Sequence, residues 1–189
     1  CMSEIVHGQP NMYFLFMAMA VKMLRTNGEF VFITPRSWTS GTYFKSFRSY
    51  FMDSMDIQRV HLFESRNSVF KGKEGHSDDI LQETMITYGK KSKSQSRNII
   101  IAISQNAQDL GKVKEIQVES GNCLPEGKEH YFVLPSDEED LKVLNYMKKM
   151  PNTVEEAGFR FKTGQVVEFR NKEYIAWEKK ESTIPLLHS

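Results

Sequence analysis

An apolar helix followed directly by a short apolar strand constrains the fold of this chain more than any other feature. Residues 11–25 read NMYFLFMAMAVKMLR, apolar on every side through Val21, and Asn27 and Gly28 follow as a helix stop. Such a helix must be covered by protein on all sides, because the apolar run is too short to span a bilayer. Residues 29–34 read EFVFIT and predict a buried strand.

The next segments alternate between helix and strand patterns. Residues 42–52 repeat phenylalanines at the period of an amphipathic helix, and polar residues such as Arg48 fall elsewhere on the helical wheel. Two more strands are expected at 57–63 and 80–88, separated by the polar loop 64–79. The order helix, strand, helix, strand, strand is typical of an α/β layer.

The composition changes after Tyr88, where residues 89–97 read GKKSKSQSR. A polar, positively charged stretch of this kind predicts a surface connection, so a domain edge is expected near residue 90.

Beyond this edge we expect a smaller α+β segment. Ser136 and Glu139 form a capping box that opens a helix, which carries Leu141, Leu144 and Met147 inward and ends before a proline. Three short strands are expected ahead of that helix, at 98–104, 113–118 and 131–134.

Composition excludes several classes of protein. A total of 25 Lys+Arg against 24 Asp+Glu gives a net charge of +1, which excludes a uniformly basic DNA-coating protein but is compatible with a local basic face. The two cysteines, Cys1 and Cys123, form no CxxC pair, and the five histidines show no metal-type spacing, so we expect neither a zinc site nor a disulfide scaffold. Without a secretory signal or a long apolar run, a cytoplasmic protein with no membrane partner is expected.

The sequence contains no GxGxxG, GxxxxGK[ST], GxSxG or HExxH motif. Any cofactor-binding turn of a nucleotide-dependent enzyme is therefore expected outside these residues. The acidic run 137–140 is interpreted as the solvated first turn of a helix, where negative charge complements the helix dipole.

Two segments are candidates for binding. Residues 34–38 read TPRSW and follow a strand, at the edge where open α/β sheets bind ligands; a plain turn anchored by Trp38 is the alternative, and position alone favours it. The loop 64–79 mixes cations with Phe70, which suits contact with nucleic acid. A Phe70 side chain packed onto the sheet is the alternative there.

Three stretches, 11–51, 57–70 and 79–91, together resemble the catalytic domain of adenine-specific DNA methyltransferases of restriction-modification systems. Among these, the chain is most similar to the large type II enzymes in which methylation, and often cleavage, share one polypeptide. Residues 151–189 resemble the passage from the catalytic domain into the target-recognition domain.

The resemblance implies part of a Rossmann-like methyltransferase sheet, followed by a smaller α+β segment. Residues 29–34 would be its fifth strand, and 57–63 with 80–88 the antiparallel pair that closes the far edge. The implied domains are the C-terminal half of the catalytic domain (1–90), a connecting segment (91–150) and the start of the target-recognition domain (151–189).

The implied reaction transfers a methyl group from S-adenosylmethionine to the N6 amino group of an adenine flipped out of double-stranded DNA. The glycine-containing cofactor motif and the Asn-Pro-Pro-Tyr catalytic motif of the family are absent from the 189 residues. The chain is therefore expected to be an inactive fragment that lacks the N-terminal half of the catalytic domain. Its apolar helix and first strand are expected to promote self-association of the fragment without biological meaning.

The resemblance also implies roles for particular residues, none of them catalytic. Phe70 would stack on the target base, and such stacking is worth about 1–3 kcal/mol per base. The DNA-facing rim would comprise Thr34, Pro35, Arg36, Ser37 and Trp38; phosphate contacts would come from Lys71, Lys73, Lys90 and Lys91; and the recognition region would include Thr163, Gly164, Gln165, Phe169 and Arg170.

Two other functions remain open on the sequence. The chain could act as a non-catalytic DNA-binding or specificity module that completes a separate catalytic chain. It could also be a self-standing α/β interaction domain, since one fold hosts many functions.

Overall fold

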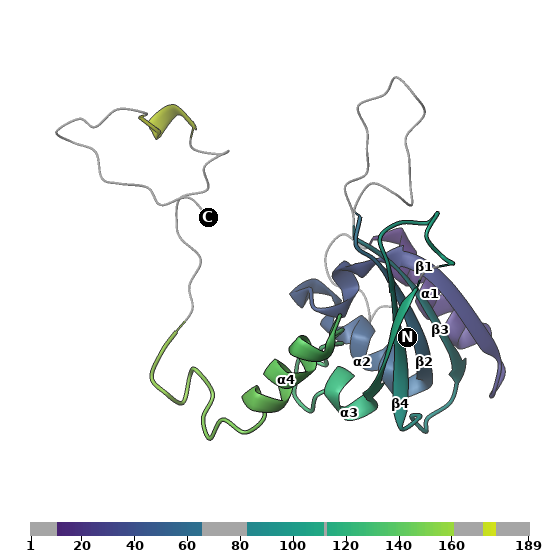
Figure 1. Ribbon diagram of the computed structural model, residues 1–189. Coiled ribbons are helices and arrows are strands. Elements are labelled where there is room, and N and C mark those ends of the chain that lie inside the picture. The colour runs from purple at the N-terminus through teal and green to yellow at the C-terminus, as the bar shows by residue number, and fades with distance from the viewer. Residues whose placement is uncertain (1–10, 66–82, 112, 161–171, 177–189) are drawn as a thin grey trace. The chain divides into compact units, whose positions relative to one another are not determined.

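The computed structural model describes residues 11–65, 83–111, 113–160 and 172–176. The chain divides into two compact units, residues 1–149 and 150–189. In the second unit the described residues include one short 3-10 helix, η5 (Lys172–Tyr174), and the side chains of Phe159 and Tyr174 are exposed. The sheet and the longer helices lie in the first unit (Figure 1).

A five-stranded mixed sheet forms the centre of the first unit. Its strands lie in the order β1-β3-β2-β4-β5. β3 is antiparallel to both β1 and β2, β4 is parallel to β2, and β5 is antiparallel to β4. The strands are β1 (Glu29–Pro35), β2 (Met55–Phe63), β3 (Thr84–Lys91), β4 (Asn98–Ser104) and β5 (Lys114–Glu119).

The mixed α/β class expected from the sequence is confirmed, and one detail of the sheet is corrected. β2 and β3 do form an antiparallel pair, but the pair does not close the edge of the sheet. The reason is that β4 adds beside β2 and β5 beside β4. The polar stretch after β3 is a short connection into β4, within the same compact unit.

Helices that precede and follow β1 pack on one another and build the core with the sheet. The bounds are α1 (Met12–Met23), η2 (Arg36–Thr39), η3 (Thr42–Phe44), α2 (Lys45–Ser54), α3 (Ser120–Cys123) and α4 (Glu138–Met147). The core joins apolar side chains from α1, α2 and all five strands; its largest fully buried members include Phe14, Met17, Trp38, Phe47, Phe51, Met55, Ile57, Met85, Ile99 and Ile101.

The apolar helix α1 is buried on one side only, contrary to the expectation that it is covered all round. Phe14, Met17, Ala18 and Val21 are buried, whereas Phe16 is 57% exposed. β1 is an edge strand of the described sheet rather than a fully buried one. Its alternating side chains divide between the core and the surface, with Phe30 and Thr34 buried and Val31 and Ile33 exposed.

The segment 131–134 does not form the expected strand. The Phe132 amide donates to the Thr39 carbonyl (2.9 Å), and the Val133 amide donates to the Cys123 carbonyl (2.7 Å). Successive amides thus bond to two different neighbours, so no ladder with one partner strand develops.

Helix α4 begins one residue later than the capping box predicted. Its N-cap is Asp137, whose carboxylate accepts a hydrogen bond from the Asp140 amide (2.9 Å). The Asp140 carboxylate in turn accepts from the Ser136 amide and hydroxyl (2.7 Å each). Leu141 packs against the core as expected, but Met147 is 57% exposed, because α4 lies on the surface and buries none of its residues fully.

Candidate functional site

The turn after β1 is built around a buried indole. Trp38 is fully buried, its Nε1 donates to the hydroxyl of Thr34 (3.1 Å), and its ring packs against Phe47, Phe51 and Phe132. Thr34 is also buried. Of the five residues expected at the rim, these two therefore support the turn from inside, whereas Ser37 is exposed and Arg36 partly so.

A pocket with a volume of about 810 Å³ lies beside this turn. Its walls come from three parts of the chain that are distant in sequence: the end of β1 with the following turn, the residue before β3, and the segment 131–134. The lining residues are Pro35, Arg36, Ser37, Thr39, Ser40, Glu83, Tyr131, Phe132, Val133 and Leu134.

Hydrogen bonds tie the walls of the pocket together. The Arg36 amide donates to the Glu83 carbonyl (2.8 Å), and the Arg36 guanidinium donates to the Leu134 carbonyl (3.4 Å). The same guanidinium lies 4.0 Å from the Glu83 carboxylate. Arg36 therefore links all three walls and supplies a positive charge at the pocket.

The exposed hydroxyl of the rim is held from the neighbouring helix. Tyr13 of α1 and Ser37 share a hydrogen bond of 3.1 Å between their hydroxyl oxygens. Burial raises the pKa of the Tyr13 phenol, and this hydrogen bond opposes the shift. The phenol is thus neutral at physiological pH, and its ring fixes one side of the turn.

Arg48 of α2 is fully buried, whereas the helical wheel predicted a residue away from the apolar face. Its Nε and Nη2 both donate to the Glu129 carbonyl (3.2 and 2.8 Å), and Nε also donates to the His130 carbonyl (3.1 Å). Nη1 donates to the carbonyls of Trp38 (3.0 Å) and Gly41 (2.6 Å). These bonds compensate for burial of the charge and join the turn after β1 to the segment that leads into Tyr131.

Burial lowers the pKa of the Arg48 guanidinium, and nearby Tyr131 and Glu129 oppose this shift. The guanidinium carbon lies 5.4 Å from the centroid of the Tyr131 ring, within range of a cation–π contact. Sequence inspection missed Arg48 and Tyr131. The one local signal was an arginine between two phenylalanines, Phe47 and Phe51, on a helix that must be buried on that side.

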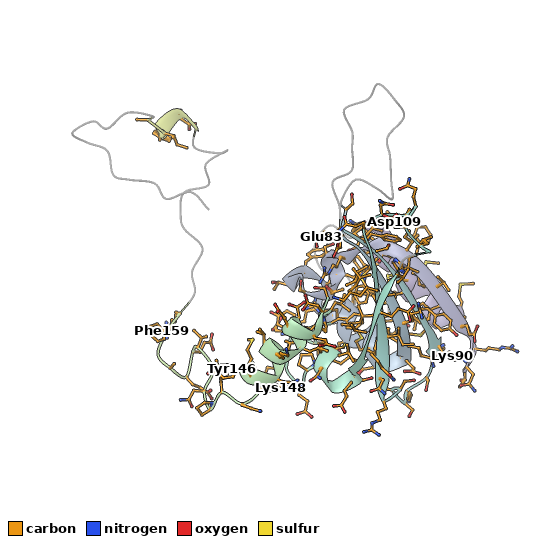
Figure 2. All side chains as sticks on the ribbon, in the orientation of Figure 1. Glu83, Lys90, Asp109, Tyr146, Lys148 and Phe159 are labelled. Carbon is orange, nitrogen blue, oxygen red and sulfur yellow. The ribbon has the colours of Figure 1, made fainter. Side chains whose placement is uncertain are left out.

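The structure does not bring Lys90 and Lys91 to the pocket. Figure 2 shows Glu83, just before β3, and Lys90, near its other end, at opposite ends of this strand. Lys90 pairs with Glu29 (3.2 Å). Lys91 donates to the carbonyls of Val21 (2.7 Å) and Leu24 (2.6 Å) at the end of α1, where a cation complements the helix dipole.

The remaining expected site residues lie outside the described part of the chain. They are Phe70, Lys71 and Lys73, and the recognition residues Thr163, Gly164, Gln165, Phe169 and Arg170.

The described residues contain neither a candidate metal site nor a membrane-spanning helix. Among them, no three or more His, Cys, Asp and Glu side chains gather in a way that could hold a metal ion. No helix in the described part is both long and apolar enough to cross a membrane.

Comparison with known proteins relates the chain to restriction-modification systems. Residues 2–70 match the family described as Eco57I restriction-modification methylase. Type II methyltransferase M.PstI of Providencia stuartii is 30% identical over 178 residues, which are 94% of this chain and 34% of M.PstI. Type II methyltransferase M.BsuBI of Bacillus subtilis is 31% identical over 182 residues, again 94% of this chain and 34% of the relative. The chain thus spans about a third of the length of these relatives.

A more distant likeness exists to the crystal structure of the M protein of the type I restriction enzyme EcoKI. It covers 80% of this chain and 47% of the M protein, with a TM-score of 0.47 and 8% identity. A likeness at this level indicates no function. The two sequence relatives, however, confirm the resemblance seen in the sequence: the chain is related over nearly its whole length to the methyltransferases of type II restriction-modification systems.

Proposed function

We propose that the protein containing this chain is a DNA methyltransferase that transfers a methyl group from S-adenosylmethionine to N6 of adenine in a restriction-modification system. The observation that carries this proposal is the similarity of 94% of the chain to two type II methyltransferases. The chain spans about a third of each relative, so the activity is assigned to the whole protein and not to this chain alone. The substrate of the whole protein is DNA.

Within that protein, residues 1–90 form the C-terminal half of a Rossmann-like catalytic domain. The strand order β1-β3-β2, with the central strand antiparallel to both neighbours, supports this assignment. Residues 91–150 add β4 and β5 to the same sheet and connect it to the target-recognition domain, which begins in 151–189. The division of the chain into units at residue 150 supports the second boundary.

The turn after β1 does not fit S-adenosylmethionine. A cofactor of this kind needs a turn where its groups approach the backbone closely, as glycine-rich turns allow. The turn after β1 contains one glycine, Gly41, and a Cβ atom there would lie 2.8 Å from the Ser37 carbonyl and 3.0 Å from the Phe44 ring. Protein already occupies that space, so the cofactor does not bind at this turn. Because the cofactor and Asn-Pro-Pro-Tyr motifs are absent from the 189 residues, the isolated chain is expected to transfer no methyl group.

The residues of this chain serve DNA binding. Arg36 and Ser37 are on the surface of the turn after β1 and form the DNA-facing rim together with Pro35, supported from inside by Thr34 and Trp38. Phe70 stacks on the target base. Phosphates are contacted by Lys71 and Lys73, and the recognition region includes Thr163, Gly164, Gln165, Phe169 and Arg170.

A second function is a non-catalytic DNA-binding or specificity module. The lack of a catalytic tetrapeptide in a chain that retains the rim and its pocket favours this alternative. The two functions differ in what the native protein does, since a specificity module binds DNA but transfers no methyl group.

The deciding experiment is a methyl-transfer assay on the native protein that contains this sequence. The purified protein is incubated with duplex DNA and S-adenosylmethionine labelled on the methyl group, and the labelled nucleoside is identified by mass spectrometry. N6-methyladenine in the DNA is expected, with none formed by the 189-residue chain. Methylcytosine would contradict the adenine assignment, and DNA binding without transfer would favour the specificity module.

A further inference from the structure

Tyr131 is an aromatic side chain that lines the pocket while it remains 41% exposed. Its ring packs against the guanidinium of Arg48, which is fully buried and bonded to four backbone carbonyls. The ring therefore rests on a support that does not move easily, and it still presents surface to the pocket.

The polar groups around this ring suit a particular kind of ligand. Arg36 supplies a positive charge, which the Glu83 carboxylate 4.0 Å away partly balances, and Ser37 and Ser40 supply exposed hydroxyl groups. The volume, about 810 Å³, is that of ligand pockets in proteins. A flat ring beside a cation binds a base by stacking and its phosphate by charge, which is how proteins hold unpaired nucleotides.

We propose that the pocket binds a nucleobase, which stacks on the exposed ring of Tyr131. This inference rests on the proposed function, because DNA supplies the base in that case. A base in a DNA strand and the base of a free nucleoside present the same ring, so both sources are tested below. Tyr131 would thus be an aromatic contact to a base in addition to the one proposed for Phe70.

The first test measures DNA binding by fluorescence anisotropy, with the complete chain and labelled single-stranded and duplex oligonucleotides. Tyr131→Ala is expected to weaken binding about tenfold, the typical worth of one stacking contact. Tyr131→Phe keeps the ring and is expected to bind within about twofold of the wild type. Tyr146→Ala is the matched control, because Tyr146 is an exposed tyrosine on α4 outside the pocket (Figure 2).

Two further readouts separate stacking from a loss of structure or charge. The slope of log Kd against log salt concentration is expected to stay unchanged in Tyr131→Ala, because no charge is removed. The thermal unfolding midpoint is expected to stay near that of the wild type. Wild-type affinity in Tyr131→Ala, or a loss in Tyr131→Phe as large as that in Tyr131→Ala, would overturn the proposal.

The second test uses the unmodified chain and therefore does not depend on a variant. The ring proton resonances of Tyr131, assigned by comparison with Tyr131→Phe, are followed by NMR while adenosine or a single-stranded oligonucleotide is added. Upfield shifts with both ligands assign the site to any nucleobase, and shifts with the oligonucleotide alone assign it to a base within a strand. If neither ligand shifts these resonances, the pocket does not bind a nucleobase.

Failure here is distinct from failure of the proposed function. If the native protein methylates adenine while the resonances of Tyr131 stay fixed, the methyltransferase assignment stands and the pocket proposal falls. If the native protein transfers no methyl group while Tyr131 still responds to nucleobases, the pocket proposal stands without the enzyme.

Discussion

Gly89 on β3 lies against the backbone of Asp56 on β2 so closely that a Cβ atom at position 89 would be 2.2 Å from the Asp56 carbonyl oxygen. The ring of Phe30 would lie 2.8 Å from the same Cβ atom. β3 is hydrogen bonded to a strand on each side, so it cannot move away from either neighbour. Position 89 therefore requires glycine for space.

Gly89→Ala is expected to lower the free energy of unfolding by about 2–3 kcal/mol, the upper range for overpacking in a core. Urea denaturation followed by circular dichroism measures this change. Gly121→Ala is the matched control, because a Cβ atom at Gly121 would have no neighbour within 4 Å. Equal midpoints for the two variants would show that β3 yields to the added methyl group.

Arg48→Met is expected to lower the free energy of unfolding by about 3 kcal/mol or more. The substitution keeps an unbranched side chain of similar length but leaves the buried carbonyl of Trp38 and the partly buried carbonyl of Glu129 without their donor. Lys45→Met, on the same helix, removes a partly exposed ion pair with Glu129 and is expected to cost little. Urea denaturation of both variants tests the difference, and a comparable loss in the two would argue against a stabilising role for the Arg48 bonds.

His61 makes stability depend on pH. Burial lowers its pKa, the positive charge of Arg59 lowers it further, and the carboxylate of Glu115 opposes both. The folded state therefore binds a proton on His61 less readily than the unfolded state, whose histidine has a pKa of about 6.5. The contribution of neutral His61 to the free energy of unfolding is complete above about pH 6.5 and is lost as the pH falls below that value.

His61→Gln is expected to reduce the loss of unfolding free energy between pH 7.5 and pH 5.5. The glutamine amide can still bond the hydroxyl of Ser104, which lies 2.8 Å from the His61 ring nitrogen. Urea denaturation at the two pH values measures the difference. If variant and wild type lose the same stability, protonation of His61 does not contribute to the pH dependence.

Two substitutions at the N-terminus of α4 distinguish the observed cap from the predicted one. Asp137→Ala is expected to destabilise the helix by about 1 kcal/mol, because the Asp140 amide loses its acceptor. Glu139→Ala is expected to have little effect, although a capping box would make it the more damaging change. Amide hydrogen exchange in α4 measures both effects. Faster exchange in Glu139→Ala alone would support the predicted capping box over the observed cap.

Local patterns predicted most elements of the first unit, because helix and strand periods depend on residues close in sequence. The helix expected at 11–25 is α1, and the strand expected at 98–104 is β4. Their neighbours in space did not follow from such patterns. The place of β2 in the middle of the sheet depends on β4 and β5, which come from the other side of the polar connection.

The candidate site was harder to predict for the same reason. The turn after β1 was located from its position at the end of a strand, and the alternative that Trp38 anchors this turn agrees with its burial. Arg48 was missed, because its acceptors at Glu129 and His130 lie more than 80 residues away in sequence. A charged side chain is ordinarily expected at the surface, and these distant carbonyls, together with those of Trp38 and Gly41, allow it to be buried.

Cys123 is expected to resist thiol reagents in the folded protein. Its side chain is fully buried, and burial raises its pKa to about 12 despite the nearby charge of Lys148. Thiol reagents attack the thiolate, so both access and ionisation are suppressed. In a Cys1→Ser background, modification with a chromogenic disulfide at pH 8 is expected to be at least about a hundredfold slower than in urea. Similar rates in the two conditions would mean that the segment around Cys123 opens readily. The Cys123 carbonyl accepts a hydrogen bond from the Val133 amide in the wall of the pocket, so that wall would open with it.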